Sequence, residues 1–285
     1  MPVTRFCFKL ADGANYIDLA QCMSLVQRTL VRQKQTFTVL GGQVVDNSNG
    51  KITISTAPNF WYTKAAINRG FRAWKQVRAK TIANAELENV ENPVGKYSDF
   101  KVTLNGVTST LLPIAGSTFA SLPAPEEWNY SDVINEDGLS RTFKIVGTNA
   151  GVMYGLMEGW IKTRETPDAS NEPTMPDLDG DGVLDYRQDF LNLLHETSDG
   201  QPERLANIYE DNDKAPFKIN ELYSDTSSNN NLQIQSYTRL QGAAGMTSAM
   251  IPGFEALCGL IQVSCSEGSS EPILFLDVMN TPEAF

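Results

Sequence analysis

Histidine is nearly absent from this chain of 285 residues, which contains only His195. A zinc site with two histidine ligands, or any histidine cluster, is therefore excluded within one chain. A hydrolytic triad of the serine, histidine and acid type requires His195 as its base. His195 ends an expected helix, Arg187 to His195, so we expect it to face solvent or a carboxylate.

Cysteine is also scarce, and the four residues form two distant pairs: Cys7 and Cys22, Cys258 and Cys265. No C-x-x-C spacing occurs, which excludes a zinc ribbon, and the pairs are too sparse for a disulfide-stapled secreted scaffold. We therefore expect buried thiols.

Long hydrophobic runs are missing. No stretch of about 18 consecutive apolar residues occurs, and the first residues, MPVTRFCFKLADG, lack the apolar core and cleavage site of a signal peptide. These absences predict a soluble protein that is synthesised in the cytoplasm and does not insert into a membrane.

The chain contains 23 lysine and arginine residues and 34 aspartate and glutamate residues, which gives a formal net charge of -11. This excess of acid argues against a nucleic-acid reader with an overall basic surface. However, residues 28–80 contain ten basic residues and one acid, Asp46, whereas the rest of the chain contains 13 basic and 33 acidic residues. The charge is therefore strongly polarised along the sequence, and the basic window either pairs with the acidic remainder or binds an anionic partner.

Two segments in the first part of the chain have helical spacing. Asp18 is expected to cap a helix that runs to about Arg32. A second, amphipathic and cationic helix is expected over Phe60 to Ile82, with its aromatic residues, Phe71 and Trp74, more typical of core packing than of base stacking.

Most other periodic segments are short and separated by turn residues. Val3 to Leu10 alternates like a half-buried strand, and Asp12-Gly13 ends it. The remaining expected strands are Thr36 to Leu40, Lys51 to Thr56, Phe100 to Leu104, Thr110 to Ile114, Arg141 to Val146, Val152 to Ile161, Leu232 to Leu240, Gly259 to Ser264 and Ile273 to Val278.

This pattern predicts a single all-β domain over residues 1–285, a sandwich, jelly roll or barrel with a few helices in long loops. Residues 164–225 are expected to form a loop-rich, acidic and partly helical insertion, which includes Arg187 to His195 and Pro202 to Tyr209.

One short motif has the spacing of a calcium loop. Its carboxylates occupy positions 1, 3, 5 and 9 and its glycine position 6, as in the loops of EF-hand and dockerin-like proteins. Position 12 holds an amide where the loop prefers a bidentate carboxylate, which weakens affinity. The predicted calcium ligands are Asp177, Asp179, Asp181, the carbonyl of Val183, Asp185 and Gln188.

Catalytic templates are missing: the sequence contains no G-x-x-x-x-G-K-[ST], no G-x-G-x-x-G after a strand, no H-E-x-x-H and no G-x-S-x-G. Asp177, Asp179 and Asp181 could be considered as catalytic acids, but they lie on a polar loop. Without apolar surroundings, nothing in the sequence would shift their pKa values. We therefore expect no enzymatic activity.

Several blocks together resemble the capsid proteins of small circular single-stranded DNA viruses and phages. They are YIDLAQCMSLVQRTLVRQ (Tyr16 to Gln33), STAPNFWYTKAAINRGFRAWKQV (Ser55 to Val77), EEWNYS (Glu126 to Ser131), IYEDNDKAPF (Ile208 to Phe217) and IPGFEALCGLIQV (Ile251 to Val263).

The resemblance implies an antiparallel jelly-roll β-sandwich, or a double jelly roll above an internal membrane. It implies a major capsid protein that self-assembles in many copies into an icosahedral virion shell, with possible minor capsid proteins as partners. The sequence departs from the resemblance in lacking an arginine-rich N-terminal arm. The basic window is then the part expected to face genomic DNA without sequence specificity, through Arg28, Arg32, Lys34, Lys64, Arg69, Arg72, Lys75, Arg78 and Lys80.

Shell assembly would also give the acidic loop a role, since divalent cations neutralise repulsion among acidic copies. Two other functions stay open. The calcium loop and the strand pattern also suit a calcium-binding β-sandwich adhesin or carbohydrate-binding module, and a hydrolase would have to use His195.

Overall fold

The computed structural model describes residues 3–46, 50–87, 97–115, 120–134, 140–147, 151–162, 232–240, 247–266 and 271–280. The chain divides into two compact units, residues 1–163 with 220–285, and residues 164–219. Every described residue belongs to the first unit. The predicted insertion at 164–225 lies outside the described residues, so the structure does not test it.

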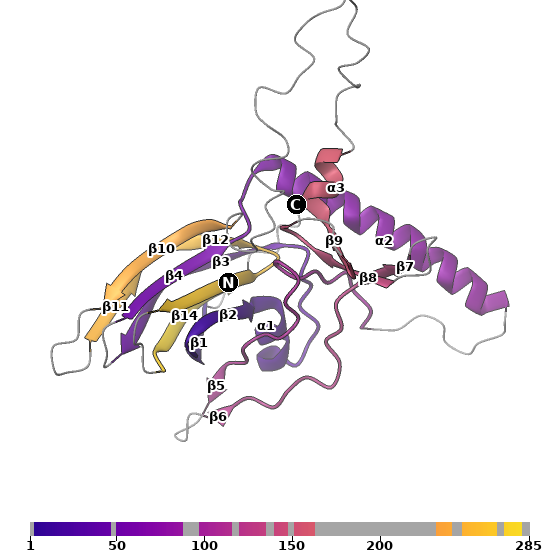
Figure 1. Cartoon of the computed structure of the whole chain (residues 1–285). Helices are drawn as coiled ribbons and strands as arrows, with labels where there is room; N and C mark the ends of the chain where they lie inside the picture. Colours follow the sequence, from indigo (N-terminus) through magenta and orange to yellow (C-terminus); the bar gives the residue numbers. More distant parts are fainter. Residues whose placement is uncertain are drawn as a thin grey trace, which may run out of the picture. The chain divides into compact units, whose positions relative to one another are not determined.

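Two antiparallel sheets dominate the described residues (Figure 1). The first has the order β1 (Val3–Lys9), β14 (Ile273–Asn280), β3 (Thr36–Asp46) and β11 (Thr247–Ile251), with β12 (Phe254–Leu257) also paired to β3. The second has the order β10 (Gln233–Leu240), β4 (Gly50–Thr56), β13 (Leu260–Ser266) and β2 (Gly13–Asp18).

The strand pairs are nested along the chain. β1 pairs with β14, β2 with β13, β3 with β11 and β12, and β4 with β10. The first strand therefore pairs with the last and the second with the last but one, as in one long hairpin. Two further contacts, β14 with β3 and β13 with β4, fold that hairpin into two sheets.

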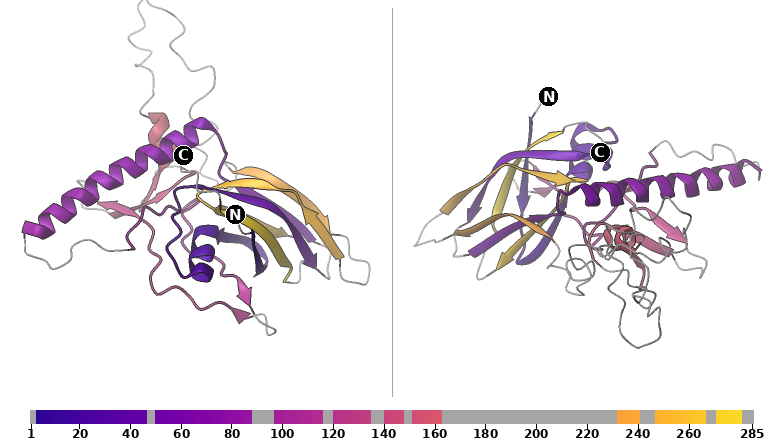
Figure 2. Two further views of the ribbon diagram at one scale, coloured as in Figure 1. Left: turned by 180° about the vertical axis from the view of Figure 1, so that it is seen from behind. Right: turned by 90° about the horizontal axis from the view of Figure 1, so that it is seen from above.

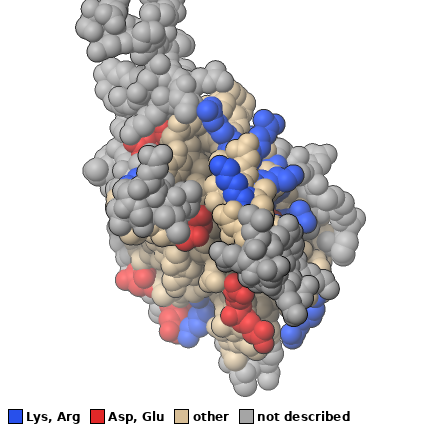
Figure 3. Space-filling view, turned by 90° about the vertical axis from the view of Figure 1, so that its right-hand side faces the viewer, with Lys and Arg blue, Asp and Glu red and all other residues tan. Residues whose placement is uncertain are grey.

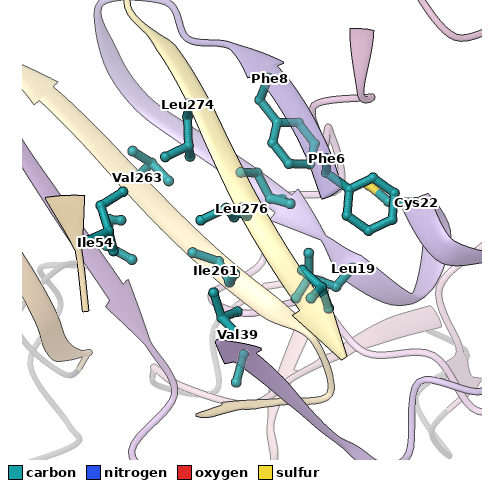
Figure 4. Close-up of a cluster of buried hydrophobic side chains, with 14 of the residues drawn as sticks. Phe6, Phe8, Leu19, Cys22, Val39, Ile54, Ile261, Val263, Leu274 and Leu276 are labelled. Atoms are coloured by element: carbon teal, nitrogen blue, oxygen red, sulfur yellow. The ribbon is translucent and has the colours of Figure 1, made fainter. Parts of the chain in front are cut away.

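The two sheets share one hydrophobic core, which makes them a sandwich (Figures 2 and 4). Phe6 and Phe8 of β1 point inward because alternate residues of a strand face the same side. Val39 and Leu276 from the first sheet belong to the same buried cluster as Ile54 from the second. Burying such a side chain contributes roughly 1.5–3 kcal/mol. The prediction of an all-β, antiparallel sandwich is confirmed at this level.

A β-bulge keeps strand β3 in phase with this core. Val39 and Val44 are both fully buried although they lie five positions apart, an odd spacing that would place them on opposite faces. The register with β14 skips Leu40, which is 49% exposed, and this extra residue restores the phase. The strand expected over Thr36 to Leu40 is longer in the structure, because Gly41 and Gly42 also lie inside β3. A Cβ atom on Gly42 would collide with the carbonyl oxygen of Phe275.

Helix α1 (Leu19–Gln27) begins where the sequence predicted. Asp18 caps it, since its Oδ1 accepts hydrogen bonds from the backbone N–H groups of Ala20 (3.0 Å) and Gln21 (3.2 Å). The predicted end near Arg32 is wrong, because Arg28 adopts a left-handed conformation with φ 54° and ends the helix.

The connection between β4 and β10 carries all remaining described elements. They are α2 (Trp61–Leu87), β5 (Ile114–Ala115), β6 (Ala120–Ser121), β7 (Asp132–Ile134), β8 (Ser140–Lys144), β9 (Met153–Gly155) and α3 (Leu156–Lys162). The strand pairs β5–β6 and β7–β8 are antiparallel, and β8–β9 is parallel.

Three predicted strands in this connection differ from the structure. Residues 100–104 form only an isolated bridge, Thr103 to Lys144, although Phe100, Val102 and Leu104 are buried. Residues 110–113 are not strand. Residues 152–161 contain the short strand β9 and then α3, because the apolar residues at 156, 157 and 160 have helical rather than alternating spacing.

Within the described residues, no helix is both long and apolar enough to cross a lipid bilayer.

Candidate nucleic-acid interface on helix α2

Helix α2 is packed along one side only. Thr63, Ala66, Ile67 and Gly70 are buried, and Ile67 belongs to a second hydrophobic cluster with Phe100 and Leu156. A Cβ atom at position 70 would lie 2.6 Å from Cδ2 of Leu156, so a larger residue there would force the Leu156 side chain to shift. The missing side chain therefore lets α3 pack against α2.

The outer side of α2 presents basic residues. At about 100° per residue, five of the predicted DNA-facing cations point away from the buried side: Lys64, Arg69, Arg72, Lys75 and Lys80. All are exposed except Lys64, which is half-buried. They extend over about 24 Å of helix, at 1.5 Å per residue. We name these five residues the α2 basic face.

Three cations near α2 lie over aromatic rings. The Arg78 guanidinium is 5.4 Å from the ring centroid of Trp74, and that of Arg69 is 5.8 Å from Trp160. Lys34 Nζ lies 4.7 Å from the ring centroid of Phe71. Such contacts stabilise a cation and hold it in place. Phe71 and Trp74 are half-buried against Phe100, as the prediction of core packing required.

The other predicted cations come from the segment after α1. Lys34 reaches α2, where burial lowers its pKa and the nearby charge of Arg72 lowers it further. Arg28 ends α1 and Arg32 is exposed. The structure thus gathers six of the nine predicted residues on one helix and brings Lys34 to it.

Three cations of the α2 basic face are not neutralised within the described part of the chain. Arg72, Lys75 and Lys80 form no ion pair with another described residue. Figure 3 shows lysines and arginines gathered in the upper part of one face, with most acidic side chains below them. Cations that no nearby acid offsets favour an anionic partner.

A buried polar network, which the sequence did not reveal, connects α1 to residues 101–131. Asp18 Oδ2 accepts hydrogen bonds from Trp128 Nε1 (3.0 Å) and Gln33 Nε2 (3.1 Å). Tyr130 Oη lies 3.5 Å from the same oxygen. Burial raises the pKa of Asp18 to about 6, although its hydrogen bonds act to lower it. Burial, and then the charge of Asp18, raise the pKa of Tyr130.

This network borders a groove of about 1010 Å³ between α1, Trp74 and residues 97–101 and 122–131. We name it the α1 groove. Its walls include Arg28, Tyr97, Asp99 and Lys101. Asp99 is 9% exposed, and burial raises the pKa of its carboxyl.

The predicted calcium ligands, Asp177, Asp179, Asp181, Val183, Asp185 and Gln188, lie outside the described residues, as does His195. Among the residues that the structure does describe, no three His, Cys, Asp or Glu side chains cluster in a way that would hold a metal ion.

The prediction of buried thiols is correct for Cys22, Cys258 and Cys265, which are free and buried. Cys7 is also free but only half-buried, because it lies on the outer face of β1. Burial raises the pKa of all four thiols, that of Cys265 to about 11.

The chain matches no protein-family model, no curated protein and no solved structure.

Proposed function

We propose that this protein is the major capsid protein of a virus, a non-catalytic subunit that self-assembles into an icosahedral shell around a DNA genome. The observation that carries the proposal is the nested pairing of β1–β4 with β10–β14. Nested pairing across two sheets is typical of a jelly roll, an architecture found in viral capsids and lectins. The described strands supply one such set, which favours a single jelly roll.

Exposed apolar side chains at the sheet edges suit contacts between copies. Within the described residues, β10 and β11 are edge strands of their sheets, and they lie beside each other. They expose Met250 (77%), Ile234 (63%) and Tyr237 (59%). Edge strands with exposed apolar side chains pair readily with further chains. This property would be a liability in a monomer and is useful in a shell.

The α2 basic face supports contact with DNA. Five cations along about 24 Å of helix offer charge to several phosphates, and contacts to phosphates bind DNA without reading its sequence. The net charge of -11 would make copies repel one another, so DNA held by this face and calcium in the loop at Asp177 to Gln188 would both favour assembly.

Assembly is tested by size exclusion with light scattering on the purified full-length chain, over a hundredfold range of concentration and with calcium or chelator. We expect the mass to rise to that of capsomers or closed particles. A monomeric mass in every condition would reject the shell and favour a carbohydrate-binding module or adhesin.

A further inference from the structure

An exposed tryptophan shares the outer side of α2 with the α2 basic face. Helix α2 begins at Trp61, which is 69% exposed. At about 100° per residue, Trp61 points within about 20° of the direction of Arg72. Lys64 and Lys75 point about 40–60° to one side of it. The indole ring therefore lies among the cations rather than on the packed side of the helix.

Neighbouring rings hold Trp61 in place. Trp160 belongs to α3, which lies beside α2 (Figure 1). It meets Trp61 at 84° with 6.4 Å between the ring centroids, and Tyr62 meets Trp61 at 87° and 6.0 Å. Neither neighbour is stacked on Trp61 in parallel, so the exposed ring can accept a further flat ring. Because these contacts already fix the ring, it loses little freedom when a ligand binds. We name Trp61 and Trp160 the α2 aromatic platform.

The surroundings of the platform are net basic. Four cations lie on α2 between positions 64 and 75, and the Arg69 guanidinium lies 5.8 Å from the ring centroid of Trp160. Two acids are nearby: Glu255 accepts a hydrogen bond from Asn59 Nδ2 at 2.6 Å, and Glu158 precedes Trp160 on α3. Even with both acids counted, the cations are in excess, so the platform attracts an anionic partner.

The outer side of α2 does not suit a protein partner or a lipid bilayer. Between its cations it presents Ala65, Asn68, Gln76 and Ala79 rather than large apolar side chains. Protein interfaces have an apolar core and are depleted in lysine, and a helix that lies in a bilayer surface needs a continuous apolar face. A single exposed ring among cations instead suits a polyanion that carries flat rings of its own.

We infer that the α2 aromatic platform stacks an unpaired base of a single-stranded nucleic acid, while the α2 basic face holds the phosphates that follow along the helix. Stacking of this kind tolerates any base, because every base has a flat face. A duplex cannot use the platform, since its bases are stacked on one another. This inference rests on the proposed function for the source of the strand, and it assigns unpaired segments of the enclosed genome to α2.

The test measures anisotropy of three fluorescein-labelled probes with the full-length chain: a short oligothymidylate, an abasic strand of the same length and a duplex of the same length. The abasic strand has the same phosphates and no bases. We expect the parent to bind oligothymidylate at least about fivefold more tightly than the abasic strand. Trp61→Ala should abolish this preference and leave duplex binding and the salt dependence unchanged, because the ring carries no charge.

Two further variants separate stacking from general apolar contact. Trp61→Phe keeps a ring and should retain most of the preference for oligothymidylate over the abasic strand. Trp61→Leu is apolar without a ring and should bind as Trp61→Ala does. The matched control is Tyr237→Ala, which removes an exposed aromatic side chain from β10 and should bind all three probes as the parent does.

Three results would overturn the inference. The first is equal affinity of Trp61→Ala and Tyr237→Ala for oligothymidylate. The second is a parallel loss of duplex and single-strand binding in Trp61→Ala, which would indicate a structural role for the ring. The third is competition by polyglutamate or by phosphatidylserine vesicles that is as effective as competition by unlabelled oligothymidylate, since neither carries flat bases.

The two proposals fail separately. Particles that form normally, while Trp61→Ala binds oligothymidylate as the parent does, would reject the platform and keep the shell. Platform-dependent binding by a chain that stays monomeric would reject the shell and keep the platform.

Discussion

Trp128 donates its indole N–H to Oδ2 of Asp18 across 3.0 Å, and this bond ties the start of helix α1 to a segment 110 residues later. The other oxygen of Asp18 caps the helix, so one carboxylate serves both α1 and the wall of the α1 groove. Removing it would leave helix N–H groups and two side-chain donors without an acceptor.

Asp18→Ala should lower the free energy of unfolding by about 3 kcal/mol or more. Loss of the cap costs about 1 kcal/mol, and each donor left buried costs roughly 1–3 kcal/mol. Urea denaturation measures the change. The control is Asp12→Ala, which removes an exposed acid from the turn before β2. Equal unfolding midpoints for the two variants would contradict the role of Asp18.

The stability of the protein should depend on pH through the same residue. Burial raises the pKa of Asp18 from 3.8 to about 6 in the folded state. Between these two pKa values the folded state therefore holds a proton that the unfolded state releases. The contribution of Asp18 to stability is greatest below the unfolded pKa and is lost as pH rises through the folded one. The difference is at most about 3 kcal/mol.

Asp18→Asn removes this titration while keeping an oxygen for the helix cap. The unfolding free energy of the parent minus that of Asp18→Asn should grow as the pH falls from neutral towards the ordinary pKa of a carboxyl. A constant difference over that range would show that the carboxylate keeps an ordinary pKa.

Neutralising the α2 basic face should weaken DNA binding and reduce its salt dependence. For Arg72→Gln/Lys75→Gln/Lys80→Gln, we expect the slope of log affinity against log salt to fall by about 2–3, at roughly 0.7 to 0.9 per phosphate contact. Fluorescence anisotropy at several salt concentrations gives the slope. The matched control removes three strand cations, Lys9→Gln/Lys51→Gln/Arg239→Gln.

If both triple variants lose affinity equally, the basic face has no special role. Particles of the α2 variant should also retain less nucleic acid than those of the strand variant, measured by the ratio of ultraviolet absorbance of nucleic acid to that of protein.

The acidic loop should bind calcium. Titration calorimetry of the parent should give a saturable heat, and Asp179→Ala/Asp181→Ala should give none, because two of the predicted ligands are lost. Glu126→Ala/Glu127→Ala removes the same charge elsewhere and should bind as the parent does. If the parent protein gave no binding heat, the prediction of a calcium site in this loop would be wrong.

Substitution to alanine should destabilise the protein much more at Gly42 than at the adjacent Gly41 in β3. Gly42→Ala drives a methyl group into the carbonyl oxygen of Phe275 in the neighbouring strand β14, whereas at Gly41 the nearest atom is 3.4 Å away. We expect Gly42→Ala to cost about 1–3 kcal/mol more than Gly41→Ala. Similar midpoints of urea unfolding for the two variants would show that the β14 backbone near Phe275 shifts to make room for the methyl group.

The sequence predicted those elements whose pattern is local. The alternation from Val3 to Leu10, the cap at Asp18 and the long basic helix α2 all follow from spacing, and the structure has them. The sequence pattern did not predict β2, because Gly13–Asp18 is short and directly follows the turn residues Asp12-Gly13. It also did not predict β11 and β12, because Pro252-Gly253 interrupts the pattern between them.

The features that the sequence did not predict depend on tertiary contacts. Gly41-Gly42 has the composition of a turn, and only the approach of β14 makes it a bulged strand. The α1 groove could not be predicted because Asp99 and Lys101 lie far in sequence from Arg28 and show no motif. The cations of α2 could be found by counting charge, but their position away from the buried side required the helix.

Negative-stain electron microscopy of the purified chain tests the central claim most directly. Samples at several concentrations, with calcium and with a short DNA added, should contain closed particles of uniform diameter or regular capsomers. Fields of single, unassociated molecules under all of these conditions would contradict a shell subunit.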